Sequence, residues 1–171
     1  MKTRLVNINY DRQKALEHAH QWAFGRNPKY LNFDKLGGDC TNFASQVIYA
    51  GSQVMNHTPV YGWYYLSSYN RTASWTGVNY LYNFLTGNKE GVGPYAEQVD
   101  VRDVKPGDIV QLSFEGGSRY NHSPVIVKVG NVPDISNILI ATHTIDRDNY
   151  ALSNYNWRGI RFLHIIGVRK G

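Results

Sequence analysis

The chain has 171 residues, of which 42% are hydrophobic and 18% are charged, a composition typical of a globular protein. No linker, repeat or charge run divides it, so we predict a single domain over residues 1–171 with a core from about residue 10 to 168. The formal net charge is +5, but the basic residues are scattered and form no nucleic-acid-binding motif. We therefore expect no specific nucleic-acid partner.

The N-terminal segment, residues 1–6, lacks the apolar stretch of a signal peptide, and the sequence contains no transmembrane stretch. The single cysteine excludes an internal disulfide and does not by itself define the redox compartment.

Residues 11–24 form the first predicted helix, which Gly25 and then Pro28 bring to an end. His18 and His20 flank its apolar stripe on opposite sides, about 100° away in each direction, so they cannot bind one ion together. The stripe consists of Ala15, Leu16, Ala19, Trp22 and Ala23.

The only cysteine follows two glycines and an aspartate. Gly37 and Gly38 permit a tight turn, and Asp39 is a good N-cap for a helix that begins at Cys40. Unpaired N–H groups and the dipole at a helix start favour an anion, which lowers the pKa of a thiol and enriches the nucleophilic thiolate. The predicted apolar face contains Cys40, Phe43, Ala44, Val47 and Gly51, with Asn42 and Gln46 opposite.

The pattern changes from helices to strands along the chain. Residues 76–85 predict a short helix closed by Gly87, and residues 87–99 predict an irregular connection. Helices first and antiparallel strands afterwards define an α+β fold. The predicted strands, rich in Val and Ile, cover residues 108–112, 123–129, 138–142 and 160–168.

Many of the 13 tyrosines and 4 tryptophans lie in one loop-rich stretch, at residues 61–65 and around Tyr69 and Trp75. Aromatic side chains on loops commonly line sugar or peptide grooves, and they also pack beneath long loops. The sequence leaves both interpretations open.

Two histidines are placed near each other by a predicted hairpin. His122 stands at the start of one strand, and His143 closes the next. A turn within residues 130–136 brings His122 opposite residues near His143. Because neighbouring strands lie about 5 Å apart, the two rings could hydrogen-bond if they share a face of the sheet. Pro124 has no backbone N–H to donate to a neighbouring strand, so it must lie at a sheet edge, at a bulge or at the start of a strand.

Residues 37–46, GGDCTNFASQ, resemble the signature of the bacterial putative amidase domain, a relative of the NlpC-type and CHAP-type cell-wall hydrolases among the papain-like cysteine peptidases. Further segments recur in the expected order, at residues 10–12, 105–108, 121–123 and 142–144. The resemblance spans about residues 10 to 168. It implies a papain-like (NlpC-like) core in which the helix of the catalytic cysteine packs on an antiparallel sheet.

The resemblance also implies the roles of the site residues. The Cys40 thiolate attacks a carbonyl, and His122 takes its proton as general base. A polar residue on the following strand completes the site; His143 would orient His122, with Asp146 and Asp148 in reserve.

Substrate contacts are predicted around the same turn. The backbone N–H of Cys40 would donate to the oxyanion, and Tyr30 is a suggested side-chain donor. Asp39 would hold a substrate amine, as the matching acidic residue does in NlpC-type enzymes.

The predicted function is a cysteine amidase or peptidase without a cofactor, acting on peptidoglycan or a peptide. One alternative is a zinc hydrolase with Cys40, His122 and His143 as ligands, although no short paired-ligand spacing occurs. The other is a non-catalytic module that binds wall glycan or peptide. Because the predicted substrate is peptidoglycan, we expect an extracytoplasmic or cell-wall location. Since the sequence has no signal peptide, the chain would reach it as part of a longer protein or by another export route.

Overall fold

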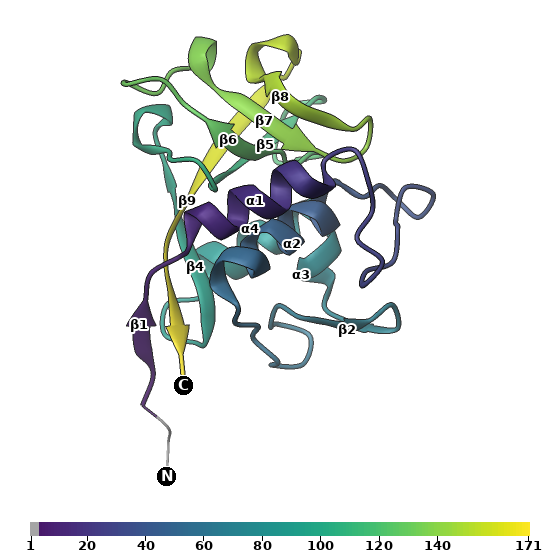
Figure 1. Cartoon of the computed structure of the whole chain (residues 1–171), viewed down its shortest axis with the longest axis vertical. Helices are drawn as coiled ribbons and strands as arrows, with labels where there is room; N and C mark the ends of the chain where they lie inside the picture. The colour runs from purple at the N-terminus through teal and green to yellow at the C-terminus, as the bar shows by residue number, and fades with distance from the viewer. Residues whose placement is uncertain (1–3) are drawn as a thin grey trace.

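A computed structural model describes residues 4–171 (Figure 1). Its helices pack against a seven-stranded antiparallel sheet, so the fold is α+β, with an antiparallel sheet as predicted. The helices are α1 (Arg12–Trp22), α2 (Cys40–Ser52), α3 (Ala73–Thr76) and α4 (Val78–Gly87). The strands of the large sheet are β1 (Val6–Ile8), β4 (Gly93–Val99), β5 (Ile109–Ser113), β6 (Val125–Lys128), β7 (Leu139–Thr142), β8 (Arg147–Ala151) and β9 (Gly159–Lys170).

The long strand β9 organises the sheet. The strand order is β1-β9-β5-β6-β7-β8, and β4 pairs along the other edge of β9. Because β1 pairs antiparallel with the end of β9, the N-terminal and C-terminal segments lie side by side (Figure 1). A separate hairpin of β2 (Tyr65–Ser67) and β3 (Asn70–Arg71) lies on the helix side, beyond α2.

Alternate residues of the strands pack on opposite faces of the sheet. Ile109, Val125 and Ala141 belong to the core under the helices, whereas their neighbours Val110 and Ile126 belong to a second core on the far face. This alternation is the period of two expected for strands that are buried on both sides. In β5 every residue is buried.

Helix α2 begins at Cys40, as predicted, but it is buried on all sides rather than along one stripe. The two polar residues expected opposite the apolar face are buried and hydrogen-bonded. Asn42 donates to the Leu31 carbonyl, and Gln46 pairs with His18 of α1. These satisfied amides allow a helix with polar residues to occupy the centre of the molecule.

Asp39 occupies the N-cap position of α2, but its side chain makes no capping hydrogen bond, which corrects the prediction that it caps the helix. The helix predicted over residues 76–85 is α4, which begins at Val78.

The helix over residues 11–24 is α1, capped by the Asp11 side chain, and the 130–136 turn joins β6 to β7. Pro124 directly precedes β6, at a strand start. The irregular connection predicted over residues 87–99 is wrong, because its second half is β4, which pairs with β9 despite its glycine, proline and polar residues.

Within residues 4–171, no helix combines the length and the apolarity needed to cross a bilayer.

Candidate active site

The thiol of Cys40 lies at the first residue of α2 and is nearly buried, with 7% of the residue exposed. Sγ lies 3.7 Å from the Thr41 hydroxyl, and the backbone of Ser123 acts to lower the thiol pKa. Thr41 and Gln111 both donate to the Ser123 hydroxyl, at 3.4 and 3.1 Å. A polar network therefore ties the thiol to the strand start that carries the predicted base.

His122 immediately precedes Ser123, whose hydroxyl accepts from Thr41. The Leu112 N–H donates to the His122 carbonyl at 3.0 Å, and this bridge fixes the backbone ahead of β6. The His122 ring lies in an aromatic cluster with Phe114 and Tyr155. Within residues 4–171, the hydrogen bonds of the Cys40 side chain do not include one to this ring.

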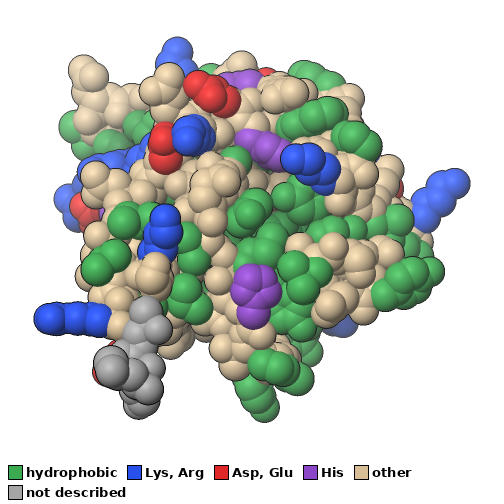
Figure 2. All heavy atoms as spheres, turned by 60° about the horizontal axis from the view of Figure 1, so that its bottom comes forward, with side chains coloured by type: hydrophobic (Ala, Val, Ile, Leu, Met, Phe, Trp, Pro, Cys, Tyr) green, Lys and Arg blue, Asp and Glu red, His purple; other side chains and the backbone are tan. Residues whose placement is uncertain are grey.

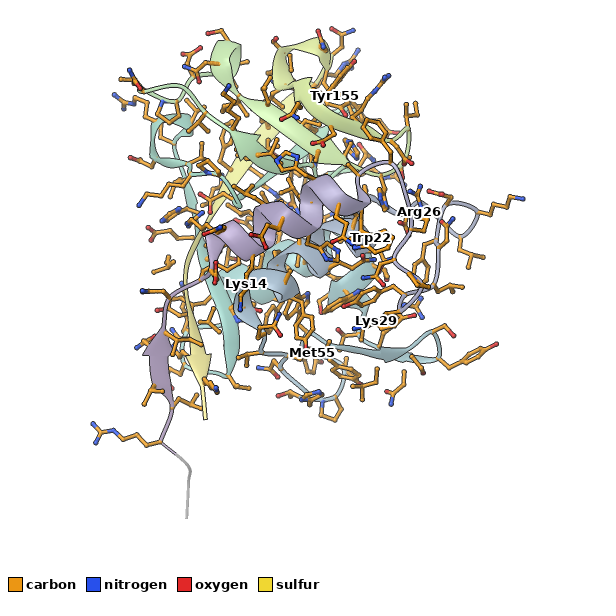
Figure 3. The ribbon with its side chains drawn as sticks, in the orientation of Figure 1. Lys14, Trp22, Arg26, Lys29, Met55 and Tyr155 are labelled. Carbon is orange, nitrogen blue, oxygen red and sulfur yellow. The ribbon has the colours of Figure 1, made fainter. Side chains whose placement is uncertain are left out.

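Tyr155 is a site residue that the sequence patterns did not reveal. It lies between β8 and β9 (Figure 3), far along the chain from the cysteine motif, and its ring centroid is 5.5 Å from that of His122. Burial raises the pKa of Tyr155 to about 12, with contributions from Tyr150 and from the nearby Cys40. The phenol therefore stays protonated at neutral pH and can donate a hydrogen bond beside the thiol.

The electrostatics of the site differ from the expectation for a helix start. Burial raises the pKa of the Cys40 thiol, and the charge on Asp39 raises it further. The prediction that the helix start lowers this pKa is therefore wrong. Burial lowers the pKa of His122 to about 4. At neutral pH the thiol of Cys40 and the imidazole of His122 are therefore both neutral, and the neutral imidazole is the form that a general base requires.

The burial of His122 makes a measurable contribution to the pH dependence of stability. Between pH 6.5 and about 4 the unfolded chain protonates this ring and the folded chain does not, so stability is complete above pH 6.5 and falls as the pH decreases through this window. The shift amounts to about 3 kcal/mol. We expect His122→Gln to flatten the decline in urea-unfolding free energy between pH 7 and 4.5. The exposed His57 is the control, and equal slopes in wild type and H122Q would contradict the assignment.

His143 does not orient His122, and this part of the predicted site is corrected. Its Nδ1 binds the Asp39 carboxylate and its Nε2 binds the Trp22 carbonyl at 2.7 Å, while the ring stacks on Phe43. Because residues opposite each other in paired strands share a face, His122 lies with Leu112 on one face of the sheet and His143 points to the helices on the other.

Both ring nitrogens of His143 are engaged, one by the Asp39 carboxylate and the other by the Trp22 carbonyl oxygen. The contact with Asp39 is buried. Burial acts to raise the pKa of Asp39, but hydrogen bonds from His143, Asn42 and the Phe33 N–H outweigh it and keep that pKa below its usual value.

Asp39 is fully buried, which is incompatible with the predicted binding of a substrate amine. Its Oδ1 accepts from the Phe33 N–H and from Asn42, and its Oδ2 accepts from His143. Its backbone N–H donates to the Thr144 hydroxyl. The same hydroxyl would lie 3.2 Å from a Cβ atom added to Gly38, so a larger residue there would be crowded. The glycine turn and the contact with His143 together hold the start of α2 in place.

The reserve residues lie in surface ion pairs away from the thiol. Asp146 binds Arg26 in a bidentate contact, and Asp148 binds His20 at 2.8 Å. Arg26, in the loop after α1 (Figure 3), also approaches Asp39 at 3.6 Å. The suggested oxyanion donor Tyr30 is likewise elsewhere, stacked on Trp75.

The structure does not assemble the three ligands of the zinc alternative. Among residues 4–171, no three His, Cys, Asp or Glu side chains are grouped so that they could hold a metal ion. Both nitrogens of His143 are already engaged, and its ring lies on the opposite side of the sheet from His122.

Comparison with known proteins places this chain in a family. A model of the putative amidase domain matches residues 9–166, so the chain belongs to that family of amidase-like domains. It is 34% identical over 131 residues to the uncharacterized protein YhbB of Bacillus subtilis (strain 168). The match covers 74% of this chain and 40% of YhbB, so the chain spans well under half of that relative. No solved structure matches it.

Proposed function

We propose that this protein is a cysteine amidase or peptidase with a papain-like core, in which Cys40 is the nucleophile and His122 the general base. The family name supports amide hydrolysis. The observation that supports the cysteine mechanism is the chain of contacts from Sγ through the Thr41 hydroxyl to the Ser123 hydroxyl, because Ser123 directly follows His122. To act as the base, the His122 ring must reach Sγ around the start of β6. The neutral imidazole and the position at a helix start support the same assignment.

The proposed reaction has two halves. His122 takes the Sγ proton as sulfur attacks the amide carbonyl carbon; the C–N bond then breaks, and the imidazolium protonates the leaving amine. A thioester to Cys40 remains. In the second half His122 takes a proton from water, the hydroxide attacks the thioester, and the proton returns to the thiolate that leaves.

The oxyanion of each tetrahedral intermediate requires donors that are already in place. The backbone N–H of Cys40 is one of the unpaired donors of the first helical turn. The Tyr155 hydroxyl is the proposed side-chain donor in place of Tyr30, since it is close to Cys40 and stays protonated. Removal of the phenol would then slow catalysis without affecting the thiol.

We propose bacterial peptidoglycan as the substrate and the cell wall as the place of action. The resemblance of residues 37–46 to cell-wall hydrolases supports this assignment, and the net charge of +5 favours approach to anionic wall polymers.

Peptidoglycan digestion tests the proposed chemistry. Wild-type protein should release new amino groups from purified peptidoglycan, iodoacetamide should abolish the release, and a chelator should leave it unchanged. Loss of activity with a chelator but not with iodoacetamide would instead support zinc chemistry. Protein that sediments with cell walls and releases no amines from any wall preparation would support the binding module.

A further inference from the structure

A pocket of about 410 Å³ lies between helix α4 and the loop that follows α2. It contains no charged residue, and its walls are aromatic rings and amides. Tyr61 and Tyr80 are 85% and 62% exposed, which is unusual for large side chains beside a cavity with apolar walls. The hydrophobic side chains on the face carrying the loops below α2 are visible in Figure 2.

The polar groups of the pocket are amides and hydroxyls, of which Asn56, Asn88 and Ser74 are bonded to the protein and others are not. Asn83 is exposed on α4, and within residues 4–171 its side chain has no hydrogen-bond partner. The hydroxyls of Tyr61, Tyr80 and Thr58 are likewise free in the described structure. A side-chain amide offers two donors and an acceptor, and an aromatic ring offers an apolar face.

The loop that carries Tyr61 is held in a fixed shape. Asn56 and Trp63 exchange two backbone hydrogen bonds at its base, and the Asn56 side chain accepts from the Thr58 N–H. Gly62 closes the turn, where a side chain would meet the Asn56 carbonyl oxygen at 2.3 Å. Tyr61 is thus presented on a preorganised turn rather than on a loose one.

The same loop contains backbone strain. Val60 has φ of 69°, in the left-handed region that a β-branched residue adopts only at a cost, and it is 73% exposed at the pocket. Strain of this kind persists where the surrounding structure enforces it and concentrates at ligand-binding positions.

The pocket is distinct from the Cys40 site, and none of its lining residues belongs to α2. It begins beyond the C-terminal end of α2, whereas Cys40 begins that helix, and α2 is about 20 Å long. Trp63, next to the pocket, packs on Phe84 of its wall and donates to Ser45 of α2 at 3.1 Å. A ligand in the pocket is therefore held at a fixed distance from the thiol.

We propose that this pocket binds an uncharged saccharide. A pyranose ring has an apolar C–H face that stacks on an aromatic ring, and its hydroxyls both donate and accept, as amides do. The lack of any charged wall residue excludes recognition by ion pairing and matches a neutral ligand. The volume lies at the small end of the range for ligand pockets, which suits one or two sugar rings. The proposal does not depend on turnover at Cys40.

Titration of isotope-labelled wild-type protein with chitotetraose, cellotetraose and a tetrapeptide of alanine, followed by NMR, tests the proposal. We expect one or both saccharides to shift amide resonances of the 56–62 loop and of α4, with a Kd of about 1 mM or tighter. Tyr61→Ala and Tyr80→Ala should each weaken binding by up to about tenfold, because each removes a stacking face. Binding of chitotetraose alone would still support the proposal and would show that the acetamido group is recognised.

Tyr69→Ala is the matched control, since Tyr69 is 99% exposed and does not line the pocket. It should bind as wild type does. The proposal is overturned if neither saccharide binds, if the alanine peptide alone shifts these resonances, or if saccharide binding survives both pocket substitutions unchanged. None of these outcomes bears on amide hydrolysis, so failure here is distinguishable from failure of the proposed function.

Discussion

Cys40→Ser should lower the rate of amide hydrolysis by a factor of at least about 10³ while leaving the fold unchanged. Serine has nearly the same size, and its hydroxyl can take the place of the sulfur beside the Thr41 hydroxyl. It is a much weaker nucleophile beside an imidazole whose pKa is as low as about 4. The release of amino groups from peptidoglycan measures the loss, and circular dichroism verifies the fold.

His122→Ala should reduce the rate to a similar extent, because a buried thiol whose pKa is raised depends on a base. His57→Ala is the matched control, since that ring is exposed and contacts Tyr64 rather than the thiol. If H122A keeps more than about a tenth of wild-type activity while C40S has none, another group accepts the proton.

His143→Ala should destabilise the protein by about 3–5 kcal/mol, because it removes the side chain that binds Oδ2 of the buried Asp39 and leaves only the more distant Arg26 near that atom. This cost is a large share of the stability of a typical domain, so we expect extensive unfolding at moderate temperature. Urea unfolding followed by tryptophan fluorescence measures it. The effect is on stability rather than on the chemical step, since both ring nitrogens face away from His122.

Asp146→Ala is the control for this prediction. Asp146 and Arg26 are each about a quarter exposed, so loss of their ion pair should cost about 1 kcal/mol or less. An H143A protein that keeps wild-type stability and loses only activity would restore the orienting role. His143→Gln should be milder than H143A, because an amide can still donate to Asp39.

Local patterns were sufficient to predict the elements that carry the site. The glycine turn, the N-terminal aspartate and the apolar spacing predict α2 from Cys40, and the β-branched runs predict the β6–β7 hairpin. Strand β4 was missed because its seven residues begin with Gly93 and Pro94 and include the polar Glu97 and Gln98. Its pairing with β9, about 70 residues later, determines its conformation, and no local pattern contains that pairing.

The arrangement of the site was harder to predict than its elements. Both strand faces are apolar, so the sequence could not show that His122 and His143 point to opposite sides of the sheet. The phenol of Tyr155 reaches the thiol from a distant part of the chain that has no motif. The direction of the Cys40 pKa shift depends on the balance of burial against the helix dipole, and burial is a property of the whole fold.

The buried contact between His143 and Asp39 at the start of α2 also has a consequence for the order in which activity is acquired during folding. His143 directly follows β7, binds Asp39 before α2 and contacts the carbonyl of the last residue of α1, so a single side chain connects three segments that are distant in sequence. These contacts become favourable together only when all three segments have docked. The nucleophile should therefore acquire its environment late, and hydrogen exchange at the start of α2 should require the same free energy as global unfolding.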